Sequence, residues 1–277
     1  MDAGRALTPA ASRTRHTGGM AVTEELRIRR PPPPFRVAEV VEVADRSPHL
    51  RRLVLAGPEL VGFAEPEPAA SIRWLPARGD ALEIPEWNGN EFLYADGSRP
   101  PIRTLTPLEV DGTAGRLAVE VVLHGAGPLS DWARRAAPGM PVAVSGPGRG
   151  YVPDPEAPHL LLAGDETAIP AIGQVLAAAA PTTRVDVAIE ARPDAVVTLP
   201  DHPQASVRWH EPVPGEREGE ALVRAVAAVP LEPGSRAWVA GEAAAVQRVR
   251  RLLFEERGLP RSVATVRGYW KHGRRGT

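Results

Sequence analysis

Residues 159–180 read HLLLAGDETAIPAIGQVLAAAA, and this stretch decides the fold of the second half of the chain. The apolar run at His159–Ala163 predicts a buried strand, and the alanine-rich run at Ala168–Ala180 predicts a helix. A polar turn at 164–167 joins the two. Ligands of open α/β sheets bind at the carboxyl ends of the strands, so this turn is expected to face a binding site.

The same alternation of strand and helix continues toward the end of the chain. Further strands are expected at Arg184–Glu190, Ser206–Trp209, Arg236–Ala240 and Val263–Arg267, and further helices at Ala221–Val229 and Ala243–Glu256. Such an alternation predicts an α/β domain with a parallel sheet and helices on its faces.

The first half has a different rhythm of short β-rich runs between Pro, Gly and Asp residues. The expected strands are Phe35–Val43, Leu50–Ala56, Ser71–Leu75, Ile102–Leu108, Arg116–His124 and Pro141–Val144. Apolar and polar positions alternate in several of them, and only one short helix is expected. This pattern predicts a six-stranded antiparallel β-barrel, with a loop or loose hairpin at 77–99.

The change of rhythm near residues 151–158 divides the chain into domains at 35–153 and 154–277. Residues 1–34 show no periodicity and end in four prolines, so we expect a disordered arm there, within which Met20 is an alternative start.

Composition excludes several classes of function. The chain has 277 residues, 33 basic and 34 acidic side chains, and no cysteine, and its basic set includes a single lysine, Lys271. A charge near zero argues against a nucleic-acid or membrane-surface binder. With no apolar run of membrane-spanning length and no secretory signal, we expect a cytoplasmic monomer. Without cysteines or paired histidine spacings, we expect no protein-bound metal, which favours an organic cofactor.

The sequence HGAGPLSDWA at 124–133 ends one predicted strand and opens the short helix. Ser130 is the expected N-cap of that helix. The glycines Gly125 and Gly127 permit a close backbone approach, and the helix start offers N–H groups to an anion such as a diphosphate. An ordinary glycine turn before a capped helix is the alternative.

The sequence RTLTPL at 103–108 lies on the preceding predicted strand. Antiparallel pairing is expected to bring Arg103 beside the same anion site, while Thr106 offers a hydroxyl and its backbone to a flavin ring. A solvated strand arginine is the alternative.

In the second domain, two predicted strand ends meet at one edge of the sheet. Gly164–Thr167 follows the first strand, with Thr167 as the expected helix cap, and Gly241–Glu242 follows another. Plain helix capping is the alternative. The chain then ends in a segment with six cations and no acid after Glu256, in which aromatic and basic residues alternate. Such a segment is suited to an anionic aromatic ligand, or is a solvated basic tail.

Four of these motifs, taken in order, resemble the siderophore-interacting protein family, whose members are flavin-dependent ferric-siderophore reductases. They are HGAGPLSDWA at 124–133, GDETAIP at 164–170, WVAGE at 238–242 and GYWK at 268–271. The resemblance spans about residues 35–273. It implies a ferredoxin–NADP reductase-like fold, in which FAD binds the barrel and NADPH or NADH binds the parallel sheet.

The resemblance also implies the site residues. The expected FAD contacts are Arg103, Thr104, Leu105, Thr106, His124, Gly125, Gly127, Pro128, Ser130 and Trp132. The expected NAD(P)H contacts are Gly164, Asp165, Glu166, Thr167, Gly241 and Glu242. A ferric siderophore is expected near Arg267, Trp270, Lys271, His272 and Arg274. Lys271 and Asp165 are the expected catalytic residues.

One departure from the family pattern bears on flavin binding. The family's flavin strand usually reads Arg-x-Tyr-Thr-x-Arg, whereas this chain has Leu105 and Leu108 at the aromatic and second arginine positions. A stacked aromatic ring contributes ~1 kcal/mol beyond its area, and an arginine–phosphate contact ~1.5–3 kcal/mol. Their loss predicts FAD affinity weakened by roughly two to three decades.

The sequence therefore predicts an NAD(P)H-dependent flavin reductase of ferric siderophores. Two alternatives stay open: a non-enzymatic protein that binds flavin or a ferric chelate, and a flavin-dependent reductase of another small acceptor. The choice between NADH and NADPH, and the class of siderophore, are also open.

Overall fold

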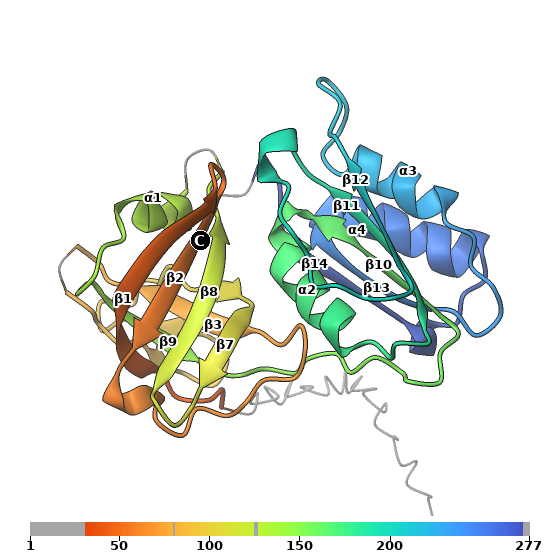
Figure 1. The fold of residues 1–277 in the computed structure, drawn as a ribbon. Helices are drawn as coiled ribbons and strands as arrows, with labels where there is room; N and C mark the ends of the chain where they lie inside the picture. The colour runs from red at the N-terminus through yellow and green to blue at the C-terminus, as the bar shows by residue number, and fades with distance from the viewer. Residues whose placement is uncertain (1–30, 80, 125–126, 274–277) are drawn as a thin grey trace, which may run out of the picture.

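The computed structural model describes residues 31–79, 81–124 and 127–273. Most of the predicted arm therefore lies outside the described residues, as do Gly125 and Arg274. Figure 1 shows two domains side by side, an antiparallel sheet followed by a parallel sheet with helices.

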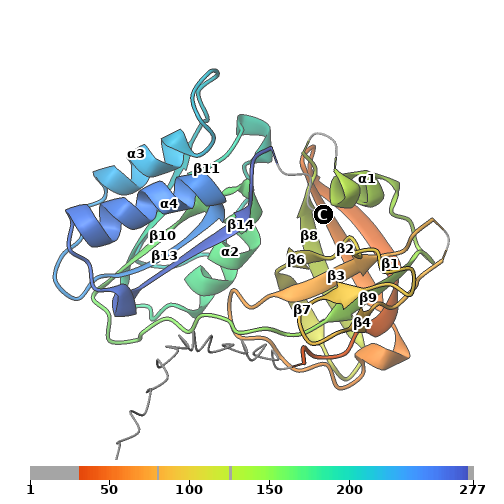
Figure 2. The ribbon, with the colours of Figure 1, turned by 180° about the vertical axis from the view of Figure 1, so that it is seen from behind.

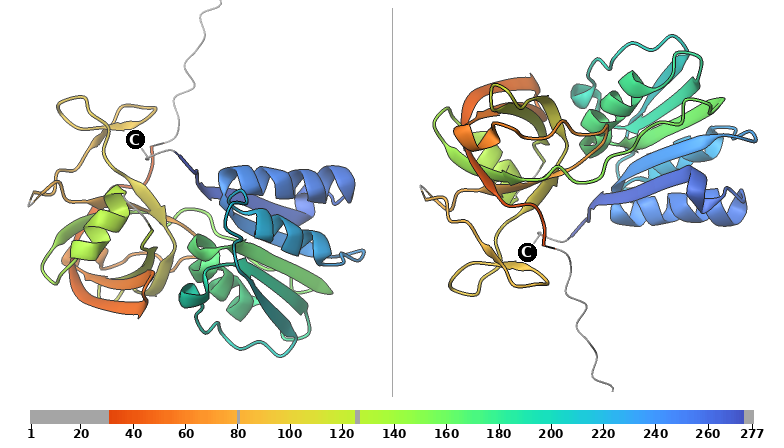
Figure 3. Two further views of the ribbon diagram at one scale, coloured as in Figure 1. Left: turned by 90° about the horizontal axis from the view of Figure 1, so that it is seen from above. Right: turned by 90° about the horizontal axis from the view of Figure 1, so that it is seen from below.

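Seven strands of the described chain form the antiparallel sheet of the first domain, in the order β6-β3-β9-β1-β2-β8-β7. Figure 3 shows this sheet curled into a barrel. Their bounds are β1 Arg36–Ser47, β2 Leu50–Ala56, β3 Ile72–Pro76, β6 Arg103–Leu105, β7 Pro107–Asp111, β8 Arg116–Val122 and β9 Pro141–Ser145. A loose hairpin of β4 (Glu86–Trp87) and β5 (Phe92–Leu93) lies in the segment where a loop or hairpin was expected.

The prediction of six strands was wrong at one place, because the run at 102–108 forms two strands rather than one. β6 pairs with β3 at one edge of the sheet, and β7 pairs with β8 at the other. Only Thr106 lies between them, so one residue connects the two edges. Pro107 lacks the N–H that a continuing ladder needs, which explains the change of partner.

The barrel core is built around two tryptophans. Trp74 of β3 is fully buried, and Trp132 of helix α1 (Pro128–Arg135) meets it edge to face at 5.2 Å between ring centroids. Alternating apolar residues of β2 and β8, among them Leu53, Leu55 and Val119, fill the remaining interior. Helix α1 is thus fixed to the barrel by Trp132.

Five parallel strands form the second domain, in the order β12-β11-β10-β13-β14. Their bounds are β10 His159–Asp165, β11 Arg184–Glu190, β12 Ala205–His210, β13 Arg236–Glu242 and β14 Ala264–Trp270. Helix α2 (Ile169–Ala178) covers one face, and α3 (Glu220–Ala228) and α4 (Ala243–Arg251) cover the other, as Figure 1 shows. The predicted fold class is confirmed, although α4 ends in a π-helical turn at Leu252–Glu256.

Three side chains, Gln174, His49 and Arg267, make polar contacts between the domains on either side of the connection between β9 and β10, where we propose the domain boundary. The Gln174 amide accepts from the Ala69 N–H at 3.0 Å and donates to the Pro107 carbonyl at 2.8 Å. His49 Nε2 lies 2.7 Å from Asp194 Oδ2. Arg267 donates to the Gly150 carbonyl at 3.3 Å. Together they hold the carboxyl edge of the parallel sheet against the barrel.

Candidate functional site

The end of β14 lies at the junction of the two domains. The Trp270 ring stacks on the His124 imidazole, with centroids 6.2 Å apart and an interplanar angle of 23°. The Tyr269 side chain lies close enough to Thr106 for Thr106 to affect its titration, and burial raises the pKa of Tyr269 to about 12. In Figure 2 the end of β14 points toward the barrel. Two consecutive aromatic residues of the second domain therefore contact the barrel at both of its predicted flavin motifs.

Asp165 organises this junction from the end of β10. Its Oδ2 accepts from the Trp270 indole N–H and the Glu242 backbone N–H, both at 2.8 Å. Its Oδ1 accepts from the backbone N–H of Thr167 at 3.0 Å and from the Thr167 hydroxyl at 2.5 Å. Burial raises the pKa of this carboxyl. With four donors already on it, Asp165 acts as a positioning residue rather than as a catalytic acid or base.

The expected helix cap was wrong, because Asp165 rather than Thr167 caps the turn that follows β10. The same arrangement recurs along the sheet edge, where an acid ends each of three strands and accepts from the start of a helix. Glu190 ends β11 and accepts from Gly219 N at 3.1 Å and Leu222 N at 2.7 Å. Glu242 ends β13 and accepts from Ala245 N at 2.8 Å. All three acids are buried.

Two glycines allow this edge to close. A Cβ on Gly164 would lie 2.5 Å from the Ala168 Cβ and 2.6 Å from the Ala240 carbonyl oxygen. A Cβ on Gly241 would lie 2.6 Å from Asp165 Oδ2. Both positions therefore require glycine for close packing around Asp165, whether or not a ligand also approaches them.

Glu166 turns its carboxylate toward Arg192, the second residue after β11. It accepts from the Arg192 backbone N–H at 2.9 Å and from two guanidinium nitrogens at 3.1 and 2.8 Å. The pair lies close enough to His124 to affect its titration. Partial burial lowers the pKa of His124, followed by the charges of Arg134 and Arg192, so the ring is neutral at neutral pH.

The turn into α1 differs from its prediction in how it is capped. Gly127 occupies the N-cap position, and Ser130 lies inside the helix. The Ser130 hydroxyl instead donates to the Val122 carbonyl at 3.3 Å and accepts from His124 N at 3.4 Å, which fastens the helix to the end of β8. A Cβ on Gly127 would have no described atom within 4 Å, so Gly127 itself leaves room beside the start of α1. Trp132, by contrast, is buried in the barrel core and packs there.

The strand of the other flavin motif, β6, pairs with β3 and not with β8, so the expected antiparallel pairing beside the anion site was wrong in its partner, although β6 still lies near β8. Arg103 donates to the Ile102 carbonyl at 2.9 Å, and partial burial lowers its pKa. Thr104 is exposed, Leu105 packs partly on the barrel core, and Thr106 is buried. Leu108 belongs to β7, beyond the corner, so it lies on the opposite edge strand from Arg103.

The expected substrate residues are dispersed around the end of β14. Lys271 is exposed directly after the strand, and Arg267 is held by the Gly150 carbonyl. His272 donates its backbone N–H to Glu242 Oε1 at 3.2 Å, and its ring lies 3.7 Å from Glu218. Arg274 lies outside the described residues.

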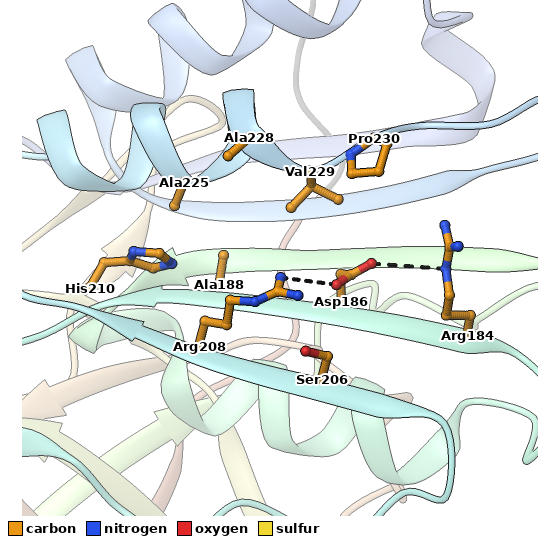
Figure 4. Close-up of a pocket in the computed structure, with 10 residues that line it drawn as sticks. All are labelled: Arg184, Asp186, Ala188, Ser206, Arg208, His210, Ala225, Ala228, Val229 and Pro230. Carbon is orange, nitrogen blue, oxygen red and sulfur yellow. Dashed lines mark hydrogen bonds and ion pairs between the residues drawn. The ribbon is translucent and has the colours of Figure 1, made fainter.

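A separate hollow of about 450 Å³ lies between β12 and α3. Figure 4 shows its polar side, where the guanidinium groups of Arg208 and Arg184 both point at the Asp186 carboxylate. Asp186 also lies 3.1 Å from the buried His159. Three charged side chains of this hollow, Arg184, Arg208 and Asp186, pair with one another, and it contains none of the expected site residues.

Two features are absent from the described part of the chain. No group of three or more metal-ligating side chains is arranged to hold an ion. No helix is both long and apolar enough to cross a membrane.

Two family models match the chain along nearly the whole described length. Residues 39–151 match the siderophore-interacting FAD-binding domain, and residues 157–273 match the siderophore-interacting protein model. The chain belongs to the siderophore-interacting protein family. The predicted family and the FAD-binding character of the first domain are thereby confirmed.

Proteins similar to this family member include both characterised and uncharacterised ones. An uncharacterised protein of Mycobacterium tuberculosis is 36% identical and covers 87% of this chain and 92% of its own length. The ferric vibriobactin reductase ViuB of Vibrio cholerae is 28% identical, with 86% and 90% covered. The mycobactin import ATP-binding/permease protein IrtA of M. tuberculosis is 34% identical over 86% of this chain but only 26% of its own length.

Solved structures give the same assignment. A siderophore utilization protein from T. fusca superposes with a TM-score of 0.77 at 29% identity, covering 88% of this chain and 95% of that one. The siderophore-interacting protein SipS from Aeromonas hydrophila gives a TM-score of 0.74 at 31% identity, covering 88% and 94%.

The residues at the junction fit FAD. Arg103 supplies a partly buried cation for a phosphate, Thr106 a hydroxyl, and Gly127 room beside the start of α1. Leu105 supplies an apolar surface for a flat ring, although without the stacking energy of an aromatic residue. Two aromatic side chains at the end of β14, Tyr269 and Trp270, would border the opposite side of the flavin ring.

No site role was expected for Glu190, Arg192 and Gln174, which also shape the site, and Tyr269 was expected only as part of the motif GYWK. A signal existed for two of them. Glu190 is an acid at the end of a predicted strand, as are Asp165 and Glu242 once their strands are extended, and Arg192 follows it closely. The contacts of Gln174 and Tyr269 cross between domains, and no local pattern indicates them.

Proposed function

We propose that this protein is an FAD-dependent reductase that uses NADPH or NADH to reduce Fe(III) in a ferric siderophore. The observation that carries the proposal is the junction itself. The two flavin motifs of the barrel and the carboxyl edge of the parallel sheet meet at Tyr269–Trp270, so a donor on the sheet and a flavin on the barrel would lie side by side. The family relationship and the similarity to ViuB support the same activity.

The residues divide by role. Arg103, Thr104, Leu105, Thr106 and the turn from His124 through Gly125, Gly127 and Pro128 would hold FAD. Gly164, Glu166, Thr167 and Gly241 would face NAD(P)H. Asp165 and Glu242 would act indirectly, since their carboxylates hold the backbone and the Trp270 ring. Ser130 and Trp132 would keep α1 in place.

Bound FAD would supply the change from a two-electron donor to one-electron steps that ferric iron requires. One NAD(P)H gives up a hydride, and its two electrons reduce two Fe(III) to two Fe(II), with one proton released. Fe(II) binds hard oxygen ligands less tightly, so the chelate loosens. The protein contributes position: neutral His124 on Trp270 limits water access, and Arg267 with Lys271 presents positive charge to an anionic chelate.

The non-enzymatic alternative rests on Leu105 and Leu108, which leave the flavin strand without its usual aromatic and second arginine. A flavin-dependent reductase of another acceptor would keep the same junction and differ only in what binds beyond Trp270.

Titration of the purified protein with FAD tests the proposal. We expect a bound-flavin absorption band at about 450 nm and weak, exchangeable FAD binding. The variant Leu105→Tyr should bind FAD about fivefold more tightly, because a stacked ring adds ~1 kcal/mol. Anaerobic mixing with NAD(P)H and a ferric chelate, with an Fe(II) trap, should then release Fe(II). If the protein never takes up FAD, the reductase proposal is overturned, and the non-enzymatic protein that binds a ferric chelate is the alternative that stands.

Lys271 provides a second test. Lys271→Ala should lower ferric-chelate turnover while FAD content stays the same, because the exposed ammonium donates to chelate oxygens as a point charge and lies outside the barrel motifs. Steady-state rates against chelate concentration, with flavin absorbance measured on the same samples, check this. Arg251→Ala, an exposed cation at the end of α4, is the matched control and should change neither value.

A further inference from the structure

We infer that this protein selects NADH over NADPH, because the half of the sheet edge that would meet the adenosine end is built from acids. The inference rests on the proposed function. A nicotinamide ring must lie at the junction with the barrel, near Asp165 and Trp270. The nucleotide would then extend along the carboxyl edge, over the ends of β11 and β12 and the start of α3. NADPH differs from NADH only by a 2′-phosphate at this adenosine end.

The start of α3 is already occupied by a carboxylate. In many α/β folds a helix N-terminus receives a phosphate through its free N–H groups. Here the buried Glu190 accepts from Gly219 N and Leu222 N, so these donors and the positive end of the helix dipole are satisfied from within the chain. A 2′-phosphate brought to this place would gain no helix donor and would meet a negative charge.

Two of the cations nearest this edge, Arg192 and Arg224, are each paired with an acid. Arg192, which follows the end of β11 closely, donates two guanidinium hydrogen bonds to the Glu166 carboxylate. Arg224 of α3 makes contacts of 2.8 and 2.7 Å with the two carboxylate oxygens of Glu216. Recognition of a 2′-phosphate needs uncompensated positive charge, and these arginines supply little of it.

The segment after β12 adds further negative charge. Residues 211–219 read EPVPGEREG, in which Glu211 and Glu218 are exposed alongside one arginine, Arg217, while Glu216 pairs with Arg224. Basic residues gather instead at the other end of the edge, at Arg267 and Lys271 beside the end of β14. The edge is therefore acidic where the adenosine would lie and basic where an anionic chelate would approach.

Equilibrium binding and kinetics with both donors test the inference. We expect NADH to bind about tenfold or more tightly than NADPH, measured by nicotinamide fluorescence, with a matching ratio of kcat/KM. The preference should shrink at high salt, because it arises from charge repulsion. Equal or tighter binding of NADPH would overturn the inference and leave the reductase intact. Failure of both nucleotides to bind would overturn the inference and the proposed function together.

Two variants test whether the charge at this edge of the sheet causes the preference for NADH. The double variant Glu216→Gln/Glu211→Lys should strengthen NADPH binding by about tenfold while NADH binding changes by less than about threefold, because it frees the charge of Arg224 and removes an exposed acid. Glu232→Gln is the control: this exposed acid pairs with Arg184 at the amino edge of the sheet and should leave the preference unchanged. A double variant that keeps the wild-type preference would overturn the electrostatic origin proposed here.

Discussion

Asp165→Asn is expected to lower the free energy of unfolding by about 2–4 kcal/mol, because the Glu242 N–H and the Trp270 indole N–H both depend on one carboxylate oxygen. An amide presents an acceptor to only one pair of donors, and its own NH2 group then faces the other pair. Burial raises the pKa of Asp165, so removal of the charge returns part of this energy. The lost hydrogen bonds outweigh that return, since each buried donor left without a partner costs about 1–3 kcal/mol.

The same variant should also lower turnover. With Trp270 released from Asp165, the end of β14 no longer fixes the distance between barrel and sheet, and a misplacement of about 1 Å costs roughly 100-fold in rate. Urea unfolding and NAD(P)H-dependent Fe(II) release are the measurements. Thr167→Ala is the matched control, because it removes one bond to the other oxygen and leaves Trp270 anchored. Equal losses in the two variants would contradict the role given to Trp270.

Gly164→Ala is expected to destabilise the protein by about 1–3 kcal/mol or more, because the new methyl group would lie 2.5 Å from the Ala168 Cβ and 2.6 Å from the Ala240 carbonyl. The Ala240 carbonyl belongs to the backbone, and the Ala168 Cβ is attached directly to it, so neither atom can move away by a side-chain rotation, and β10 would separate from β13 or from the turn into α2. Asp165, the next residue, would move with the strand, and the junction with the barrel would loosen.

A second glycine in the same strand–helix unit serves as its control. Gly173 lies inside α2, where a Cβ would make ordinary contact with Pro200 at 3.5 Å. Gly173→Ala should therefore leave stability unchanged or raise it by up to about 1 kcal/mol, since alanine favours helix more than glycine. Thermal and urea unfolding of the two variants give the comparison, and similar behaviour in both would show that the packing at Gly164 is less tight than its distances indicate.

Local patterns were sufficient for most of the elements. Strand alternation and the apolar runs predicted β1, β2, β8 and all five strands of the parallel sheet, because one or both faces of these strands are buried. They failed at Thr106–Pro107, where the chain changes from one edge of the barrel to the other. The two caps were also assigned to the wrong residues, since Ser130 and Thr167 have the chemistry of a cap but lie one turn or two residues beyond the position that caps.

The sequence by itself determined the order of a barrel and a parallel sheet, the family, and the motifs at 124–133, 164–170, 238–242 and 268–271, because these depend on local periodicity and on short runs of residues. Only the tertiary structure decided what those residues do. Asp165 was an expected catalytic residue, and in the structure its carboxylate accepts hydrogen bonds from four donors. Glu190 carried no motif, yet it closes the start of α3. The reason is physical: the role of a polar group depends on which donors, charges and solvent surround it, and residues distant in the chain supply them.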